Sequence, residues 1–173
     1  MWARRPKTMP ESNVSSESTR RDGSLVPRIV LDTNVCLDLF VFNEPMCSHV
    51  LAAMCNGVVQ AVTRDDCRDE WQRVLHYPRL PIDDANRPAI SAAFDALVRH
   101  LGDDAMSPTD AQLPRCADAD DQKFLELALA SGAQWLLSKD RELLKLDART
   151  RSAGWFPILL PQFWHAPKNK APG

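Results

Sequence analysis

Short apolar runs alternate with helical patterns along the chain, and this order limits the folds open to it. The run RIVLD, residues 28–32, is continuously apolar up to its final acid, which predicts a strand buried on both faces. Three further runs predict strands: VVQAVT at 58–63, QWLLSKD at 134–140 and WFPILL at 155–160. Because strands separated by helices favour a parallel sheet, we expect a doubly wound α/β fold.

The segments between these strands have the spacing and end signals of helices. A helix over 46–57 is closed by Gly57, and a helix over 63–77 has Thr63 as its N-cap and prolines after it. In RPAISAAFDALVRHLG the apolar residues recur at helical spacing up to Gly102. The remaining patterns predict helices over 35–42, 120–133 and 141–146.

The two ends of the chain differ from its middle. Residues 1–26 are rich in Ser, Pro, Arg and Glu without a hydrophobic period, so we expect a disordered N-terminal tail. Residues 167–173 predict a flexible C-terminal tail, which leaves one domain over 27–166.

Charge and cysteine content exclude several classes of protein. The net charge of -2 gives no overall attraction to nucleic acid, so a polyanionic substrate would need local basic residues or metal ions. Five cysteines without a C-x-x-C pair indicate reduced thiols in a cytoplasmic protein rather than a zinc site. No stretch approaches the roughly 20 apolar residues of a membrane span, and the N-terminus lacks the apolar core of a secretory signal.

Two predicted strands end in an acid. Asp32 closes RIVLD and Asp140 closes QWLLSKD, and neither continues the apolar pattern of its strand. In open α/β sheets, ligands bind in the crevice outside the carboxyl ends of the strands. We therefore expect both aspartates at the same ligand-binding edge.

Further acids lie on predicted helices that can reach this edge. Asp121 is at the N-terminal end of the inward stripe of its helix, and Asp118 lies one turn earlier. Asp120 is about 100° away from Asp121 on a helical wheel and is expected to face solvent. Glu70 flanks the apolar face of the helix over 63–77.

A crevice that gathers these carboxylates would bind protons at raised pKa or bind cations. Oxygen ligands without a Cys/His set suit Mg²⁺ or Mn²⁺, which can activate water for attack on a phosphodiester. Thr33 and Asn34 follow Asp32 and could orient an acid or a metal-bound water. Taken singly, each acid also has an ordinary explanation as a turn residue, helix cap or solvated side chain, so only the joint pattern favours a metal site.

Three segments together resemble the PIN domain family: VLDTNV, DEWQRVLHYPRL and CADADDQKFLELALASGAQWLLSKDRELL. The resemblance runs from Arg28 to about Trp164 and is greatest to bacterial PIN proteins that are toxin components of toxin–antitoxin systems. It implies a three-layer α/β/α sandwich with a central parallel sheet of about four or five strands. It also implies a ribonuclease dependent on Mg²⁺ or Mn²⁺, RNA as substrate, an antitoxin as partner, and a homodimer.

The resemblance assigns roles to individual positions. Asp32, Glu70, Asp121 and Asp140 match the catalytic, metal-binding acids, Asp118 matches an additional acid, and Ser138 matches the usual Thr or Ser before the last acid. A glycine is more usual at the position of Lys139. The basic residues nearest these acids are candidate phosphate contacts: Lys139, Arg141, Arg64, Arg68, Arg73 and Arg79.

The aromatic residues have other expected roles. Trp71, Trp135, Trp155 and Trp164 lie in apolar patterns and are expected in the core or an interface, whereas Phe40 and Phe42 are candidates for a dimer surface.

Two other functions remain open at this stage. A non-catalytic module with the same fold would bind RNA or protein without cleaving it. A phosphatase on an α/β fold would want D-x-D after the first strand, and Asp32 is followed by Thr33 and Asn34 instead.

Overall fold

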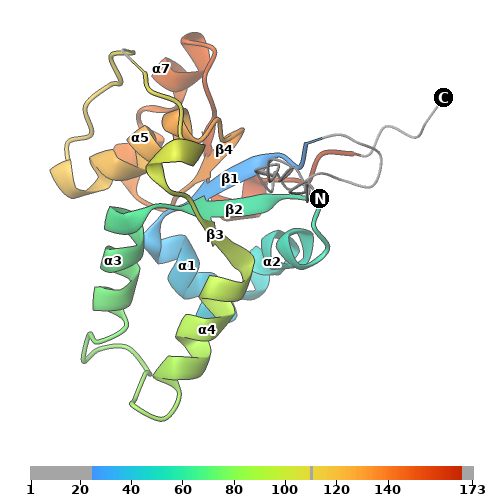
Figure 1. Ribbon diagram of the computed structural model, residues 1–173, viewed down its shortest axis with the longest axis vertical. Coiled ribbons are helices and arrows are strands. Elements are labelled where there is room, and N and C mark those ends of the chain that lie inside the picture. The colour runs from blue at the N-terminus through green and yellow to red at the C-terminus, as the bar shows by residue number, and fades with distance from the viewer. Residues whose placement is uncertain (1–24, 110, 169–173) are drawn as a thin grey trace, which may run out of the picture.

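The computed structural model describes residues 25–109 and 111–168, and these residues form a five-stranded, wholly parallel sheet with the order β3-β2-β1-β4-β5 (Figure 1). This confirms the predicted α/β fold with helices on both faces of a central parallel sheet. The strands are β1 (Arg28–Leu31), β2 (Gln60–Thr63), β3 (Val98–His100), β4 (Trp135–Leu137) and β5 (Ile158–Leu159).

Helices follow the strands in chain order. They are α1 (Thr33–Phe40), α2 (Ser48–Cys55), α3 (Asp65–Val74), α4 (Arg87–Leu97), α5 (Gln122–Ala130), α6 (Arg141–Leu144) and α7 (Asp147–Ser152). Short 3-10 turns occur at η1 (Pro45–Cys47), η2 (Asp103–Ala105), η3 (Ala119–Asp121) and η4 (Pro161–Phe163).

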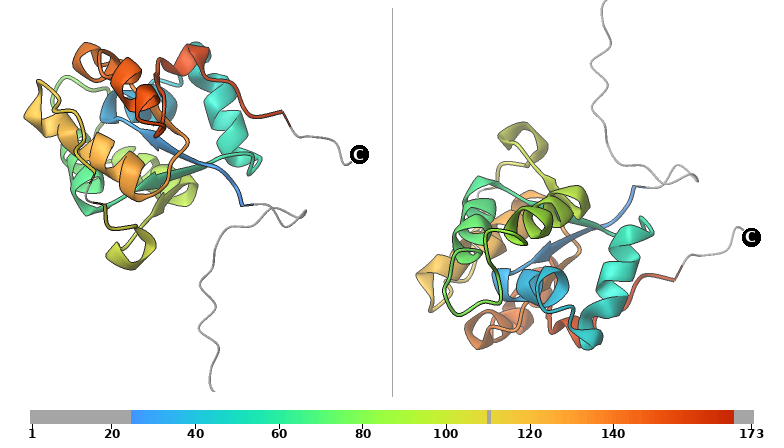
Figure 2. Two further views of the ribbon diagram at one scale, coloured as in Figure 1. Left: turned by 90° about the horizontal axis from the view of Figure 1, so that it is seen from above. Right: turned by 90° about the horizontal axis from the view of Figure 1, so that it is seen from below.

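Side-chain alternation along the central strands produces a hydrophobic cluster on each face of the sheet. Ile29 and Leu31 pack with residues of α1 to α4, whereas Val30 between them packs with residues of α5 and α6. Figures 1 and 2 show α1 to α4 on one side of the strands and α5 and α7 on the other. The strands are therefore buried on both faces, as their continuous apolar runs predicted.

One predicted helix was wrong at its C-terminal end. The pattern over 87–102 predicted a single helix up to Gly102, but α4 ends at Leu97 and Val98–His100 form β3. Val98 and Arg99 lie in parallel register with Ala61 and Val62 of β2. Pairing with the open edge of β2 supplies backbone hydrogen bonds that no local pattern reveals, and it outweighs the helical spacing.

Smaller differences concern helix ends. Thr63 is the last residue of β2 and the N-cap of α3 is Arg64, so the predicted cap was one residue early. The helix ends at Val74, before Pro78. Gly57 does follow the end of α2 with a φ of 66°, a conformation that favours glycine. Helix α7 had no predicted counterpart.

Most of the large aromatic side chains are buried or partly buried in the hydrophobic core. Trp71 and Trp164 are buried, and Phe40 packs edge to face against Trp71 and Phe94. Phe40 thus belongs to the packing between α1, α3 and α4, whereas Phe42 is exposed.

The predicted tails, 1–26 and 167–173, fall largely outside the described residues. All five cysteines are free thiols. Within residues 25–109 and 111–168, no single helix is long and apolar enough to cross a membrane; the bent pair Thr33–Phe40 and Pro45–Cys55 passes the same criteria only jointly, by length and composition.

A candidate acidic active site

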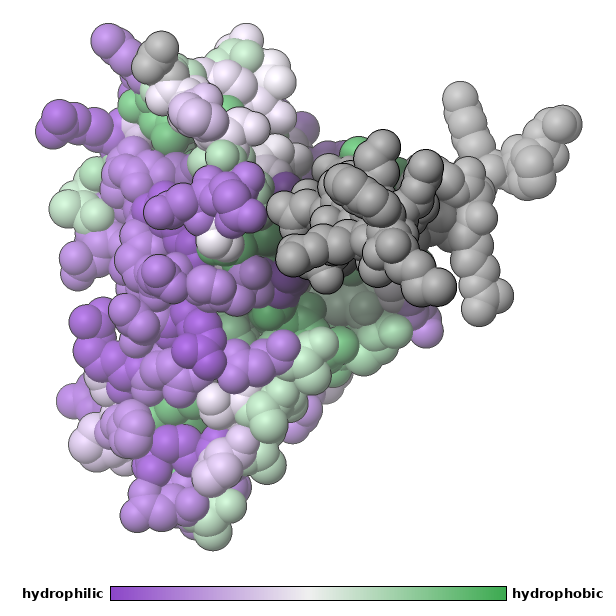
Figure 3. Space-filling model, in the orientation of Figure 1, coloured by the Kyte–Doolittle hydropathy of each residue, from purple (hydrophilic) through white to green (hydrophobic). Residues whose placement is uncertain are grey.

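A cleft of about 330 Å³ lies at the carboxyl ends of the strands. It is bounded by the start of α1, by α3 and the turn after it, and by the η3 turn before α5. The acids that line it are Asp32, Glu70, Asp118, Asp120 and Asp121. Hydrophilic residues also gather on the α3 and α5 side of the molecular surface (Figure 3). The structure thus brings most of the predicted acids to one cleft.

Asp32 is the innermost acid and is 3% exposed. It is the N-cap of α1, and its Oδ1 accepts a hydrogen bond from the Val35 amide at 2.8 Å. Its Oδ2 accepts a hydrogen bond from the hydroxyl of Ser138. Burial raises the pKa of Asp32 from 3.8 to about 6, although these hydrogen bonds oppose the rise. The cap interpretation of Asp32 is therefore correct, and it does not exclude a ligand role.

Asp140 lies after β4, beside Asp32. Its Oδ1 accepts hydrogen bonds from the amides of Glu142 and Leu143 at 2.7 and 3.1 Å, so it caps α6. Its own amide donates to Ser138 Oγ at 2.9 Å. Ser138 therefore connects the two strand-end aspartates, and the charge of Asp140 contributes to the raised pKa of Asp32.

Asp121 occupies the N-cap position of α5 and is half-buried. Burial, together with repulsion from Asp118, Asp140, Asp32 and Glu70, raises its pKa from 3.8 to about 7. The other four predicted acids therefore all lie close enough to Asp121 to repel its charge. They include Asp140, which does not line the cleft itself.

The outer acids are more accessible. Asp118 is exposed and accepts a hydrogen bond from the Asp120 amide at 2.9 Å. Asp120 is exposed as predicted, yet it also lines the cleft.

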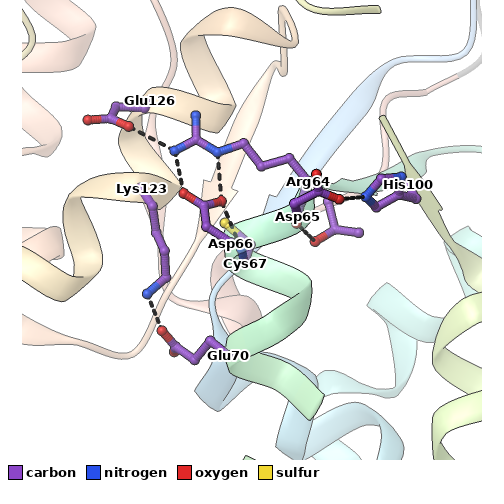
Figure 4. A network of polar contacts seen from close by, with 9 residues as sticks. Arg64, Asp65, Asp66, Cys67, Glu70, His100, Lys123 and Glu126 are labelled. Carbon is purple, nitrogen blue, oxygen red and sulfur yellow. Dashed lines mark hydrogen bonds and ion pairs between the residues drawn. The ribbon is translucent and has the colours of Figure 1, made fainter. Parts of the chain in front are cut away.

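Glu70 approaches from α3 and has a cationic partner that the sequence did not reveal. Thr33 Oγ1 donates to Glu70 Oε1 at 2.6 Å, and the ammonium of Lys123 pairs with Glu70 Oε2 (Figure 4). Thr33 was expected to orient an acid, and it contacts this one. The signal for Lys123 was its place two residues after Asp121, beside the inward Phe124.

The chemistry of these side chains fits a hard divalent cation. The acids of the cleft offer carboxylate oxygens, which hard cations prefer as ligands. Burial and charge repulsion raise the pKa of Asp32 and Asp121, so a cation bound there would lower the cost of ionising them. Among the described residues, no group of three or more His, Cys, Asp or Glu side chains is arranged to hold a metal ion as it stands. Two of the acids have other partners in this arrangement: Glu70 pairs with Lys123, and Asp140 accepts hydrogen bonds from amides of α6.

Three of the six predicted phosphate contacts form ion pairs within the protein: Lys139, Arg64 and Arg68. Lys139 forms an ion pair with the buried Asp38 at 2.7 Å. Arg64 pairs with Asp66 and Glu126. Ion pairs therefore tie these two cations to the protein itself.

The other four predicted arginines differ in their surroundings. Arg68 pairs with Asp95, and Arg79 and Arg141 are exposed. Arg73 lines the acidic cleft, and no described residue forms an ion pair with it.

Like Lys123, Tyr77 was not predicted from the sequence as a residue of the site. Tyr77, the single tyrosine of the chain, lines the cleft four residues after Arg73 and is 50% exposed. Its amide bonds to the Val74 carbonyl at 2.9 Å, which places it on the turn that ends α3. A guanidinium and an aromatic ring thus stand in the same cleft as the acids.

Comparison with known proteins identifies the fold family. A family model described as a PIN domain matches residues 28–142, from β1 to the start of α6, and this range contains all the acids described above. No curated protein sequence matches the chain.

Proposed function

The chain belongs to the PIN domain family, whose members generally have a nuclease fold, and we propose that it is a ribonuclease dependent on Mg²⁺ or Mn²⁺. The observation that carries this proposal is the gathering of acids from the end of β1, from α3 and from the η3 turn in one cleft, where the pKa of Asp32 and of Asp121 is raised. Burial is the main cause of both shifts and charge repulsion between the carboxylates adds to them, and a cluster of perturbed acids in a cleft is typical of a functional site.

Each acid has a distinct role in the proposal. Asp32 and Asp121 would hold the cation, with Asp118 and Asp140 beside them. A bound divalent cation supplies activation of water and stabilisation of charge on the phosphodiester. Ser138 keeps the Asp32 carboxylate in one orientation, and Thr33 does the same for Glu70.

Two other residues that line the cleft, from α3 and the turn after it, support RNA as the substrate. Arg73 would contact a backbone phosphate, and the exposed ring of Tyr77 would stack on a base. Because stacking requires an unpaired base, the proposed substrate is a single-stranded segment.

Cleavage of total RNA by purified protein, with the ends mapped, tests the proposal. We expect cleavage with Mg²⁺ or Mn²⁺, and its loss both in EDTA and in Asp32→Asn. Asp84→Asn is the matched control, because Asp84 is an exposed acid that pairs with Arg87 outside the cleft. Undiminished cleavage in EDTA and by Asp32→Asn would reject the proposal.

We also propose, from the resemblance to bacterial toxins, that the protein is the toxin of a toxin–antitoxin pair, acts in the cytoplasm and forms a homodimer. Its expression alone should stop growth, and coexpression of a small neighbouring gene product should restore growth. Growth arrest that persists in Asp32→Asn would separate toxicity from RNA cleavage.

One contact favours a second candidate. Glu70, which lines the acidic cleft, is already paired with Lys123, as it would be in a non-catalytic PIN module that binds RNA or protein. Such a module would bind RNA equally well in EDTA and would release no fragments.

A further inference from the structure

Lys123, in the first turn of α5, brings a positive charge to Glu70, one of the acids that line the cleft. Its side chain is 15% exposed and that of Glu70 is 16% exposed, so the pair is largely shielded from water. Thr33 holds the other Glu70 oxygen at 2.6 Å. Both carboxylate oxygens of Glu70 therefore have a partner on the protein, and one of these partners, the Lys123 ammonium, carries a full positive charge.

The helices that carry this pair are fixed relative to each other. One turn after Lys123, Glu126 on α5 accepts a hydrogen bond at 2.8 Å from Arg64, whose side chain also binds Asp66 of α3 (Figure 4). The Lys123 ammonium also lies 5.4 Å from the centre of the Phe124 ring. The contact of Arg64 with Glu126 and Asp66 thus holds α3 and α5 together, and the Phe124 ring attracts the ammonium, so that both keep the ammonium beside Glu70.

We propose that the Lys123 ammonium stands in for a second divalent ion, so that the cleft binds one ion at its aspartates and none at Glu70. A second dication at Glu70 would face the ammonium directly, and repulsion between charges so shielded from water is weakly screened. Lys123 is then a positioning residue that sets the metal count. This inference rests on the proposed function, because it concerns the same cleft.

Counting bound Mn²⁺ tests the inference without RNA. Calorimetric titration of the full chain should give one Mn²⁺ per chain for the wild type and two for Lys123→Met, which removes the charge and keeps the chain length. Lys123→Gln, a second neutral variant, should also bind two. Lys123→Arg keeps the charge and should bind one.

The matched control is Lys145→Met, which removes an exposed lysine paired with Glu142 on α6 and should bind one ion. Electron paramagnetic resonance adds a separate readout: two Mn²⁺ about 3.5–4 Å apart are spin-coupled, and that signal should appear only in the neutral Lys123 variants. Circular dichroism establishes that each variant is folded.

Two ions in the wild type, or one ion in both folded neutral variants, would overturn the inference, as would a wild type that binds no Mn²⁺. The proposed function fails separately: a wild type that binds one Mn²⁺ but cleaves no RNA would reject the ribonuclease and leave the metal count supported.

Discussion

The hydroxyl of Ser138, after β4, donates a hydrogen bond to Oδ2 of Asp32, after β1 and 106 residues earlier in the chain. The same hydroxyl oxygen accepts the amide hydrogen of Asp140 at 2.9 Å. Ser138 is fully buried, so one side chain joins two strand-end acids where water does not compete.

We expect Ser138→Ala to shift the acidic limb of the RNA-cleavage pH profile upward. The hydrogen bond from Ser138 lowers the pKa of Asp32, so its loss should raise that pKa above about 6 and leave less ionised Asp32 at a given pH. Cleavage rates measured from pH 5 to 8 test this, and the loss relative to wild type should be greatest at low pH. A uniform loss across the range would contradict the explanation.

Asp32→Asn should make the metal-free protein more stable at pH 8. The pKa of Asp32 is raised from 3.8 in the unfolded chain to about 6 in the fold, so ionisation costs folding energy that is absent below about pH 4 and complete above about pH 6. Removing this cost should add about 1–2 kcal/mol, within the roughly 3 kcal/mol that such a shift represents.

Urea unfolding in EDTA at pH 8 and pH 4 measures this difference. The stability gain of Asp32→Asn should be large at pH 8 and close to zero at pH 4. A gain that grows toward pH 4 would show that the sign is wrong.

Tyr77→Ala and Arg73→Ala should weaken RNA binding in different ways. Loss of stacking costs about 1–3 kcal/mol, so Tyr77→Ala should reduce affinity roughly tenfold or more, and Tyr77→Phe should keep most of it. Arg73→Ala should reduce the salt dependence of binding, because one phosphate contact is lost.

Fluorescence anisotropy with Asp32→Asn as the background measures these effects without cleavage. An oligonucleotide with one abasic site at the stacked position should bind Tyr77→Ala and its parent equally. Full affinity of Tyr77→Ala for intact RNA would show that Tyr77 does not contact the substrate.

Lys139→Met should affect stability rather than RNA binding. Lys139 pairs with Asp38, which is 6% exposed, so the substitution leaves a buried carboxylate without its cation. Since the Lys139 side chain is 43% exposed, we expect a loss of only about 1–2 kcal/mol in urea unfolding. A selective loss of RNA affinity with unchanged stability would restore the phosphate-binding role predicted from the sequence.

The sequence by itself determined the fold class and the position of the acids. Continuous apolar runs identify strands buried on both faces, and a parallel sheet brings their carboxyl ends to one edge. From this alone Asp32 and Asp140 were expected together, and the structure joins them through Ser138. Such inferences succeed because they depend on local periodicity and on a general rule of α/β topology.

Tertiary structure alone decided which charges face one another. Lys123 meets Glu70 because α3 and α5 pack together across 53 residues of sequence, and Lys139 meets Asp38 across 101. Strand β3 likewise exists because the edge of β2 was open to it. Hydrophobic periodicity records which side chains are buried, but a charged side chain at the border of a buried stripe takes its partner from whichever element packs beside it.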